Sequence, residues 1–148
     1  MASVRSLFRD YETWLGVDLR FQGFESELAR LPGKYAAPKG CVLLASSGNS
    51  IAGGVGLTPL AGDVCEMKRM FVRPAWQGRG FGRRLAERIV FEARDRGYTH
   101  MRLDTLGRLK AALHIYRSIG FDEISAYYEN PLEDVIYLEL NLAEARLR

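Results

Sequence analysis

The chain has 148 residues, of which 47% are hydrophobic and 26% charged, a composition that excludes a low-complexity or disordered polypeptide and predicts one globular domain over residues 1–148. Two cysteines are too few for a disulfide framework, and no run of about 20 apolar residues predicts a membrane span. The N-terminus also lacks an apolar signal-peptide core. We therefore expect a cytoplasmic protein without a membrane partner, and a formal charge of +3 that suits an anionic small molecule as readily as nucleic acid.

The first 40 residues are predicted to be mainly helical. Apolar residues from Val4 to Tyr11 recur at the i, i+3, i+4, i+7 spacing of an amphipathic helix. A shorter helix fits residues 24–31, where Pro32-Gly33 ends it. Residues 34–40 are expected to form a loop.

Residues 41–72 change to the pattern of β-strands. Apolar runs at 41–45 and 51–57 flank Ser46-Ser47-Gly48-Asn49, which predicts a hairpin. Residues 66–72 (EMKRMFV) follow a second turn and alternate along a third strand. A period of two predicts Met67, Arg69 and Phe71 on one face and the other four side chains on the opposite face.

The second half of the chain alternates helices with strands. A helix is expected over residues 80–96, a strand over 100–105 and a second helix whose apolar stripe ends at Tyr116, before Gly120. Residues 121–125 and 135–142 are predicted to form a closing antiparallel pair. The order indicates a mixed sheet with helices on its faces, an α/β or α+β domain.

The segment WQGRGFG (residues 76–82) places three glycines directly before a basic helix. A helix start presents free backbone N–H groups and the positive end of the helix dipole, which together bind phosphate groups. Glycines leave room for close approach, and Arg79, Arg83 and Arg84 can add charge-assisted hydrogen bonds. We interpret the segment as a phosphate-binding loop rather than as a flexible helix cap or a merely solvated basic face.

Two common nucleotide-binding motifs do not fit this loop. A P-loop needs Lys-Ser or Lys-Thr after its last glycine, and neither pair follows any glycine at that spacing. The dinucleotide fingerprint needs a third glycine where Arg83 stands. The pattern that remains is Gln77-x-x-Gly80-x-Gly82 after the strand EMKRMFV.

This pattern resembles the GNAT superfamily of N-acetyltransferases, whose Q/R-x-x-G-x-G/A loop holds the pyrophosphate of acetyl-coenzyme A. The resemblance resumes in AALHIYRSIGF (residues 111–121), which is similar to the family's second cofactor-side helix, and residues 41–142 fit the family's order of elements. It implies a mostly antiparallel central sheet flanked by helices. No strand is evident before residue 41, so this sheet is expected to lack the family's first edge strand. The asparagine common in the second helix is also absent, since Arg108, Leu109 and Lys110 occupy its region.

The resemblance also assigns a set of contacts to acetyl-CoA. Backbone groups of two strand residues should pair with the pantetheine arm as a neighbouring strand would, and the loop and second helix should contact the rest of the molecule. The cofactor-binding residues implied in this way are Phe71, Val72, Gln77, Gly78, Arg79, Gly80, Phe81, Gly82, Arg83 and Ala112. No metal is expected.

Acetyl transfer needs a base for the amine and an acid for the departing thiolate. Glu66 occupies a place comparable to that of the family's carboxylate base, although a salt bridge with Lys68 or Arg69 explains it equally well. Tyr116 matches the tyrosine that lies beside the coenzyme sulfur in relatives, with a core tyrosine as the alternative. His100 and His114 have no partner pattern and are expected to be structural.

The resemblance therefore predicts an acetyl-CoA-dependent N-acyltransferase that acts on a primary amine of a small molecule or peptide. The N-terminal helices, residues 34–40 and the Tyr127-Tyr128 connection should wall the amine pocket, and four carboxylates could attract a cation there: Asp18, Glu25, Glu27 and Glu66. A non-catalytic acyl-CoA-binding module is the alternative. A nucleic-acid-binding domain is disfavoured because interleaved exposed aromatic residues are missing. The strand VIYLELNL could pair across a homodimer.

Overall fold

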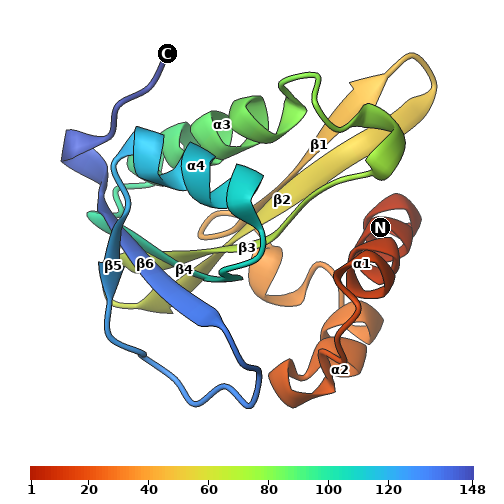
Figure 1. Cartoon of the computed structure of the whole chain (residues 1–148), viewed down its shortest axis with the longest axis horizontal. Coiled ribbons are helices and arrows are strands. Elements are labelled where there is room, and N and C mark those ends of the chain that lie inside the picture. Colours follow the sequence, from red (N-terminus) through yellow and green to blue (C-terminus); the bar gives the residue numbers. More distant parts are fainter.

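The structure is a computed structural model that describes all 148 residues. It contains four α-helices, a six-stranded sheet and short 3₁₀ segments (Figure 1). The helices are α1 (Ala2–Leu15), α2 (Phe24–Ala29), α3 (Phe81–Asp95) and α4 (Lys110–Ile119). The strands are β1 (Cys41–Ser47), β2 (Ser50–Ala61), β3 (Val64–Val72), β4 (His100–Leu106), β5 (Asp122–Ile124) and β6 (Val135–Asn141).

The sheet has the order β1-β2-β3-β4-β6-β5 and is antiparallel except between β3 and β4. This confirms the predicted mixed, mostly antiparallel sheet, and no strand precedes β1 in the chain. The strand VIYLELNL is not a free edge, because β6 pairs with β4 along its length and with β5 at residues 137–139. β5 thus covers the centre of this strand, and pairing of the strand across a homodimer stays a prediction.

Helices cover both faces of the sheet, with α3 and α4 on one face and α1 and α2 on the other (Figure 1). The larger core joins buried residues of α3 and α4 to β2, β3, β4 and β6. The predicted helix stripe is confirmed, since Leu85, Ile89 and Ala93 of α3 are buried in this core. A smaller core of eight buried residues joins α1 and α2 to Tyr35 and Leu106.

Local sequence explains where several elements end. Gly16 takes a left-handed conformation with φ 74° and donates its backbone N–H to Glu12, which ends α1. The first hairpin turns at Gly48-Asn49, and β2 is longer than the predicted 51–57 because it continues past β1. Pro59 lies past Leu57, the last residue of β2 that pairs with β1, so the strand there is paired on one side only, as is typical of strand prolines.

The alternation predicted along β3 fails at its centre. The register with β2 shifts so that Arg69 and Met70 both lie opposite Val55, a β-bulge, and Arg69 has φ 58°. Beyond the bulge Met70 and Val72 pack on the same core as Met67, whereas Phe71 packs on Tyr11 and Trp14 of α1. The prediction that Met67 and Phe71 share a face is therefore wrong, because one extra residue reverses the pattern.

The bulge places Arg69 against the helices of the smaller core. Its guanidinium donates two hydrogen bonds of 3.1 Å to Glu27 and one to the side-chain oxygen of Gln22. Lys34 lies 3.3 Å from Glu27, and the Tyr35 hydroxyl donates to the same carboxylate at 2.8 Å. Burial opposes ionisation of Glu27, but the hydrogen bonds and charge of Arg69 outweigh it and hold the Glu27 pKa below its ordinary value.

We predict that Glu27→Gln lowers the free energy of unfolding by about 3 kcal/mol at pH 7, because it leaves the Arg69 charge buried without its partner. Glu25→Gln is the matched control: Glu25 also forms a two-bond pair, with Arg9, but its side chain is 55% exposed against 5% for Glu27. Urea denaturation measures both variants. Equal losses would contradict the buried pair as the anchor of α2.

The same pair predicts a pH dependence of stability. The folded-state pKa of Glu27 is depressed, so its contribution is present above the unfolded pKa of about 4.5 and is lost as the pH falls through the folded-state pKa. The stability difference between the wild type and Glu27→Gln should therefore shrink below about pH 4.5. A difference that is constant from pH 7 to pH 3 would contradict this assignment.

Candidate functional site

A cleft opens where β3 and β4 separate. The two strands pair in parallel only between Val64–Glu66 and His100–Arg102, although both continue beyond these residues. Past the last pair lies a cleft of about 710 Å³, which is bounded by the two strand ends, the glycine-rich segment and α4. Unpaired strand backbone next to such a space is suited to an extended ligand that takes the position of a missing strand.

The glycine-rich segment borders this cleft at the start of α3. Gly80 is the N-terminal cap residue of α3 with φ 85°, and no side chain caps the helix. The first amides of the helix therefore have no intrahelical acceptor. Gly78 has φ 78°, and a Cβ atom at Gly78 or Gly80 would meet nothing within 4 Å, so both positions combine a glycine conformation with open space. This fits the predicted anion cradle.

Two side chains of the segment are already engaged within the protein. Gln77 Nε2 donates to the Val72 carbonyl at 2.9 Å, which ties the loop to the end of β3. Arg83 Nη1 donates to Ser118 Oγ of α4 at 2.8 Å. The Val72 carbonyl thus has a partner before any ligand binds, and Arg83 also holds the two helices of the cleft together.

The structure brings nearly all the predicted cofactor residues to one cleft. Nine of the ten line it: Phe71, Val72, Gln77, Gly78, Gly80, Phe81, Gly82, Arg83 and Ala112. Arg79 is exposed on the loop and does not line the cleft. Sequence reasoning missed further lining residues, among them Trp76, Leu103 and Ile115. They are ordinary apolar residues that carry no local signal.

Tyr116 reaches the cleft from α4. Its side chain is 4% exposed and packs on Phe121 with ring centroids 5.7 Å apart, yet its hydroxyl forms no hydrogen bond within the protein. No partnerless side-chain oxygen is sealed inside the protein, so this hydroxyl reaches solvent, and the space that Tyr116 lines is the cleft. Burial raises the pKa of Tyr116 above its ordinary value, so the phenol is a protonated donor at neutral pH.

Glu66 lies at the last pair of the parallel strands rather than in the cleft lining. Both of its carboxylate oxygens are engaged: Oε2 accepts from the Tyr127 hydroxyl at 2.6 Å, and Oε1 lies 3.5 Å from Lys68 Nζ. The salt bridge that the sequence left as an alternative is therefore present with Lys68, whereas Arg69 pairs with Glu27 instead.

Asp104 is the carboxylate that lines the cleft, and sequence reasoning did not select it. It lies on β4 beyond the last residue that pairs with β3. Its Oδ2 accepts from the Tyr128 hydroxyl at 2.8 Å, and burial raises the pKa of its carboxyl against the effect of that hydrogen bond. The one signal in the sequence is an acidic residue within the otherwise apolar end of the strand HMRLDTL.

Some of the segments predicted to wall the amine pocket lie at the cleft, and others do not. Tyr11 and Trp14 of α1 line the cleft, and Tyr128 reaches Asp104, but no residue of the 34–40 loop lines it. The carboxylates expected to attract a cation are engaged elsewhere, since Asp18 pairs with Arg20, Glu25 with Arg9 and Glu27 with Arg69. Their ion pairs explain why charge alone did not locate the site.

Neither histidine lines the cleft. His100 shares a 2.9 Å contact with the Thr99 hydroxyl, and His114 is exposed on α4. No group of three His, Cys, Asp or Glu side chains converges as a metal site. Both cysteines are free, with Cys65 buried and Cys41 half-buried. No helix has the length and apolar character that crossing a bilayer would need.

A mixed sheet that splays at a parallel pair, with a glycine-rich helix start at the opening, is the arrangement of an acyltransferase of the GNAT class. Residues 2–121 match the family model described as acetyltransferase (GNAT) family. The chain is 37% identical over 142 residues to an uncharacterised N-acetyltransferase of Schizosaccharomyces pombe, covering 95% of this chain and 87% of that protein. The chain belongs to the GNAT family of N-acetyltransferases.

Solved structures share the fold. A GNAT-family acetyltransferase of Staphylococcus aureus aligns with a TM-score of 0.78 at 19% identity, covering 95% of this chain and 94% of that one. A Salmonella typhimurium protein solved with its cofactor acetyl-CoA aligns with a TM-score of 0.73 at 20% identity, covering 95% and 87%. At these identities the likeness concerns the fold.

The two tyrosines of the site should differ in their effect on stability. Tyr116→Phe removes a hydroxyl without a protein partner and should change the free energy of unfolding by less than about 0.5 kcal/mol. Tyr127→Phe removes the 2.6 Å bond to the Glu66 carboxylate and should cost about 2 kcal/mol. Urea denaturation of both variants makes the comparison. A larger loss for Tyr116→Phe would assign Tyr116 a structural role.

Proposed function

We propose that this protein transfers the acetyl group of acetyl-CoA to a primary amine of a small molecule or peptide, by direct attack of the amine on the thioester. The observation that carries the proposal is the cleft at the β3–β4 separation with the open glycine cradle at its rim. The bound acetyl-CoA of the Salmonella typhimurium structure supports this choice of acyl donor. The cytoplasmic location and the homodimer stay predictions.

Each part of the cleft has a proposed role. The first amides of α3, together with Gly78, Gly80 and the charge of Arg79, bind the pyrophosphate. The backbone of β3 at Phe71 and Val72, which lies beyond the last residues that pair with β4, and the surface of α4 at Ala112 hold the pantetheine arm. Acetyl-CoA supplies an activated acyl group as a thioester. Positioning the thioester and the amine together supplies a large part of the rate enhancement.

Tyr116 is the proposed general acid. Its partnerless hydroxyl opens to the cleft, and its raised pKa keeps the proton available for the departing thiolate. The role of Glu66 as general base, predicted from the sequence, stays a prediction. It is supported by its position beside the strand separation and opposed by the Lys68 and Tyr127 contacts that occupy both oxygens.

The cofactor loop is tested by binding. CoA at about 100 times its Kd should stabilise the wild type by about 2.7 kcal/mol and raise its Tm. Arg79→Ala should weaken CoA binding about tenfold, since it removes one charge-assisted contact with phosphate. Arg94→Ala, which removes an exposed arginine from the last turn of α3, is the matched control and should bind normally.

Calorimetry with pantetheine, which lacks the pyrophosphate, separates the loop from the rest of the cleft. The Arg79→Ala penalty should be present for CoA and absent for pantetheine. An equal penalty for both ligands would overturn the assignment of the loop to the pyrophosphate. No binding of either ligand would overturn the proposed function.

Catalysis is tested by thiol release from acetyl-CoA with a panel of primary amines. Tyr116→Phe should lower kcat about 100-fold with little change in the KM for acetyl-CoA, because only the proton donor is removed. Tyr98→Phe is the control, since its hydroxyl bonds to Lys39 away from the cleft. CoA binding without thiol release for any amine would identify a non-catalytic acyl-CoA-binding module.

A further inference from the structure

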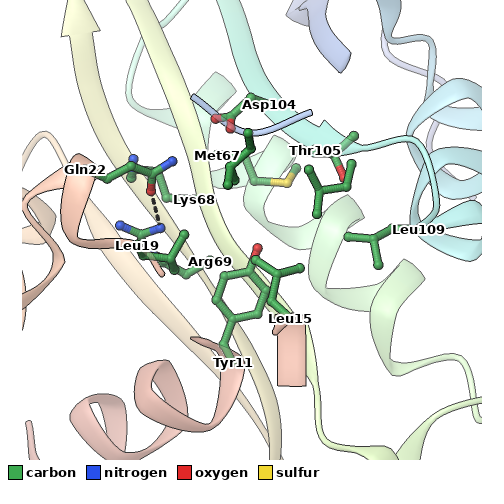
Figure 2. Close-up of a pocket in the computed structure, with 12 residues that line it drawn as sticks. Tyr11, Leu15, Leu19, Gln22, Met67, Lys68, Arg69, Asp104, Thr105 and Leu109 are labelled. Atoms are coloured by element: carbon green, nitrogen blue, oxygen red, sulfur yellow. Dashed lines mark hydrogen bonds between the residues drawn. The ribbon is translucent and has the colours of Figure 1, made fainter. Parts of the chain in front are cut away.

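A small polar cavity continues from the cleft toward α1. It has a volume of about 40 Å³ and lies between α1, the 3₁₀ turn at residues 20–22, and strands β3 and β4 (Figure 2). Several residues line both the cavity and the cleft, among them Tyr11, Asp104 and Thr105. The cavity therefore adjoins the cleft at Asp104, and no residue of the glycine loop lines it.

The charges around this cavity are paired with one exception. Lys68 lies 3.5 Å from Glu66, and Arg69 is held by Glu27 at 3.1 Å. Asp104 forms no ion pair, and its one hydrogen bond within the protein is the 2.8 Å bond from Tyr128 to Oδ2. Asp104 is half-buried, and a carboxylate that loses part of its hydration is stabilised by a cation partner because its desolvation is costly. Among the charged side chains that line the cavity, Asp104 is thus the one without an ion pair.

The contacts of Tyr128 fix how Asp104 is presented. The Tyr128 hydroxyl accepts hydrogen bonds from the side-chain amides of Gln22 at 3.1 Å and Asn130 at 3.0 Å, so its own proton is directed to Asp104. Oδ1 of Asp104 has no partner, and because no partnerless oxygen is sealed within the protein, Oδ1 is open to the shared space. One oxygen is anchored and the other is free for a ligand.

From this arrangement we infer that Asp104 binds the ammonium group of the acceptor and accepts its proton. This rests on the proposed function and assigns it a substrate class: a primary amine with one positive charge, a short apolar body and no carboxylate next to the amine. Leucines wall the cavity around the polar floor and would contact that body: Leu15, Leu19, Leu106, Leu109 and Leu132. Inside the cavity a carboxylate on the acceptor would find no free cation, since Lys68 and Arg69 are already neutralised. Arg108, which has no ion pair and donates to the Leu15 carbonyl, lines the outer cleft.

Asp104 and Tyr116 together account for every proton that moves during acetyl transfer. One ammonium proton passes to Oδ1 of Asp104, and the nitrogen lone pair forms the C–N bond to the thioester carbonyl carbon. The C–S bond breaks, Tyr116 protonates the departing sulfur, and the phenol regains its proton from the acylated nitrogen. Asp104 then releases its proton to solvent. Asp104 and Tyr116 both border the cleft, as this sequence requires.

Asp104 and Glu66 have different surroundings, and we assign them different roles. Glu66 lines neither the cleft nor the inner cavity, and its oxygens hold Lys68 and Tyr127. We therefore assign Glu66 to balancing the Lys68 charge and positioning Tyr127. Its substitution should disturb the protein through these contacts, whereas substitution of Asp104 should act on the amine directly.

The test compares Asp104→Asn with Asp122→Asn, an isosteric control at an exposed position of β5. The probes are straight-chain primary amines from methylamine to hexylamine, and 3-methylbutylamine beside leucine, which differ by the carboxylate. With acetyl-CoA at saturation, Asp104→Asn should lower kcat/KM for the amines about 100-fold or more, with CoA binding and thermal stability retained. Asp122→Asn should match the wild type.

Each result decides between the alternatives. Calorimetric binding of 3-methylbutylamine to the enzyme–CoA complex should be lost in Asp104→Asn, whereas binding of 3-methylbutanol should be unchanged, which a merely structural role would not produce. Near-wild-type kcat/KM in Asp104→Asn, or leucine exceeding 3-methylbutylamine, would overturn the inference. Normal CoA binding with no acetylation of these alkyl amines, while amines of another class release thiol, would overturn the substrate class. Absence of CoA binding would refute the proposed function itself.

Discussion

The short parallel pairing of β3 and β4 is the constraint on which the rest of the site depends. Only three residues of each strand pair before the strands separate, although both strands continue. Their inner backbone groups then need another partner, and buried backbone groups are rarely left without one. The glycine-rich start of α3 and the face of α4 border the same opening. The separation thus creates the cleft, exposes a strand edge inside it and orients a helix terminus toward it.

The bulge at Arg69 accompanies this separation and connects it to the N-terminal layer. A residue other than glycine at positive φ is strained, and such strain persists where surrounding contacts over-determine it. Here Arg69 is fixed by Glu27 and Gln22, and Phe71 packs on Tyr11 and Trp14. The same side chains thus fix α1 and α2 against the sheet. This packing sets the shape of the acceptor end of the cleft, because Tyr11 and Gln22 line the inner cavity.

The order of elements and the cofactor loop were predictable because their signals are local. A glycine run before an amphipathic helix is visible within a few residues, and nine of the ten predicted cofactor residues line one cleft. The bulge was not predictable, because one extra residue in a period-two strand leaves the composition of that strand unchanged. Asp104 was missed because its surroundings are assembled from distant parts of the chain. Tyr128 and Gln22 meet there although 106 residues separate them in sequence.

The chemical role of each acidic group near the cleft is determined by its hydrogen-bond and ion-pair partners rather than by its position in a sequence motif. Two carboxylates on neighbouring strands acquire different properties when one is paired with a cation and the other has no cation partner. The charge of Glu66 is balanced by Lys68, two residues further along β3. Asp104 is held by one neutral phenol, and burial favours its protonated form. A carboxylate in that condition gains most from an arriving ammonium, because the cation removes the cost of its burial and supplies the proton that burial favours.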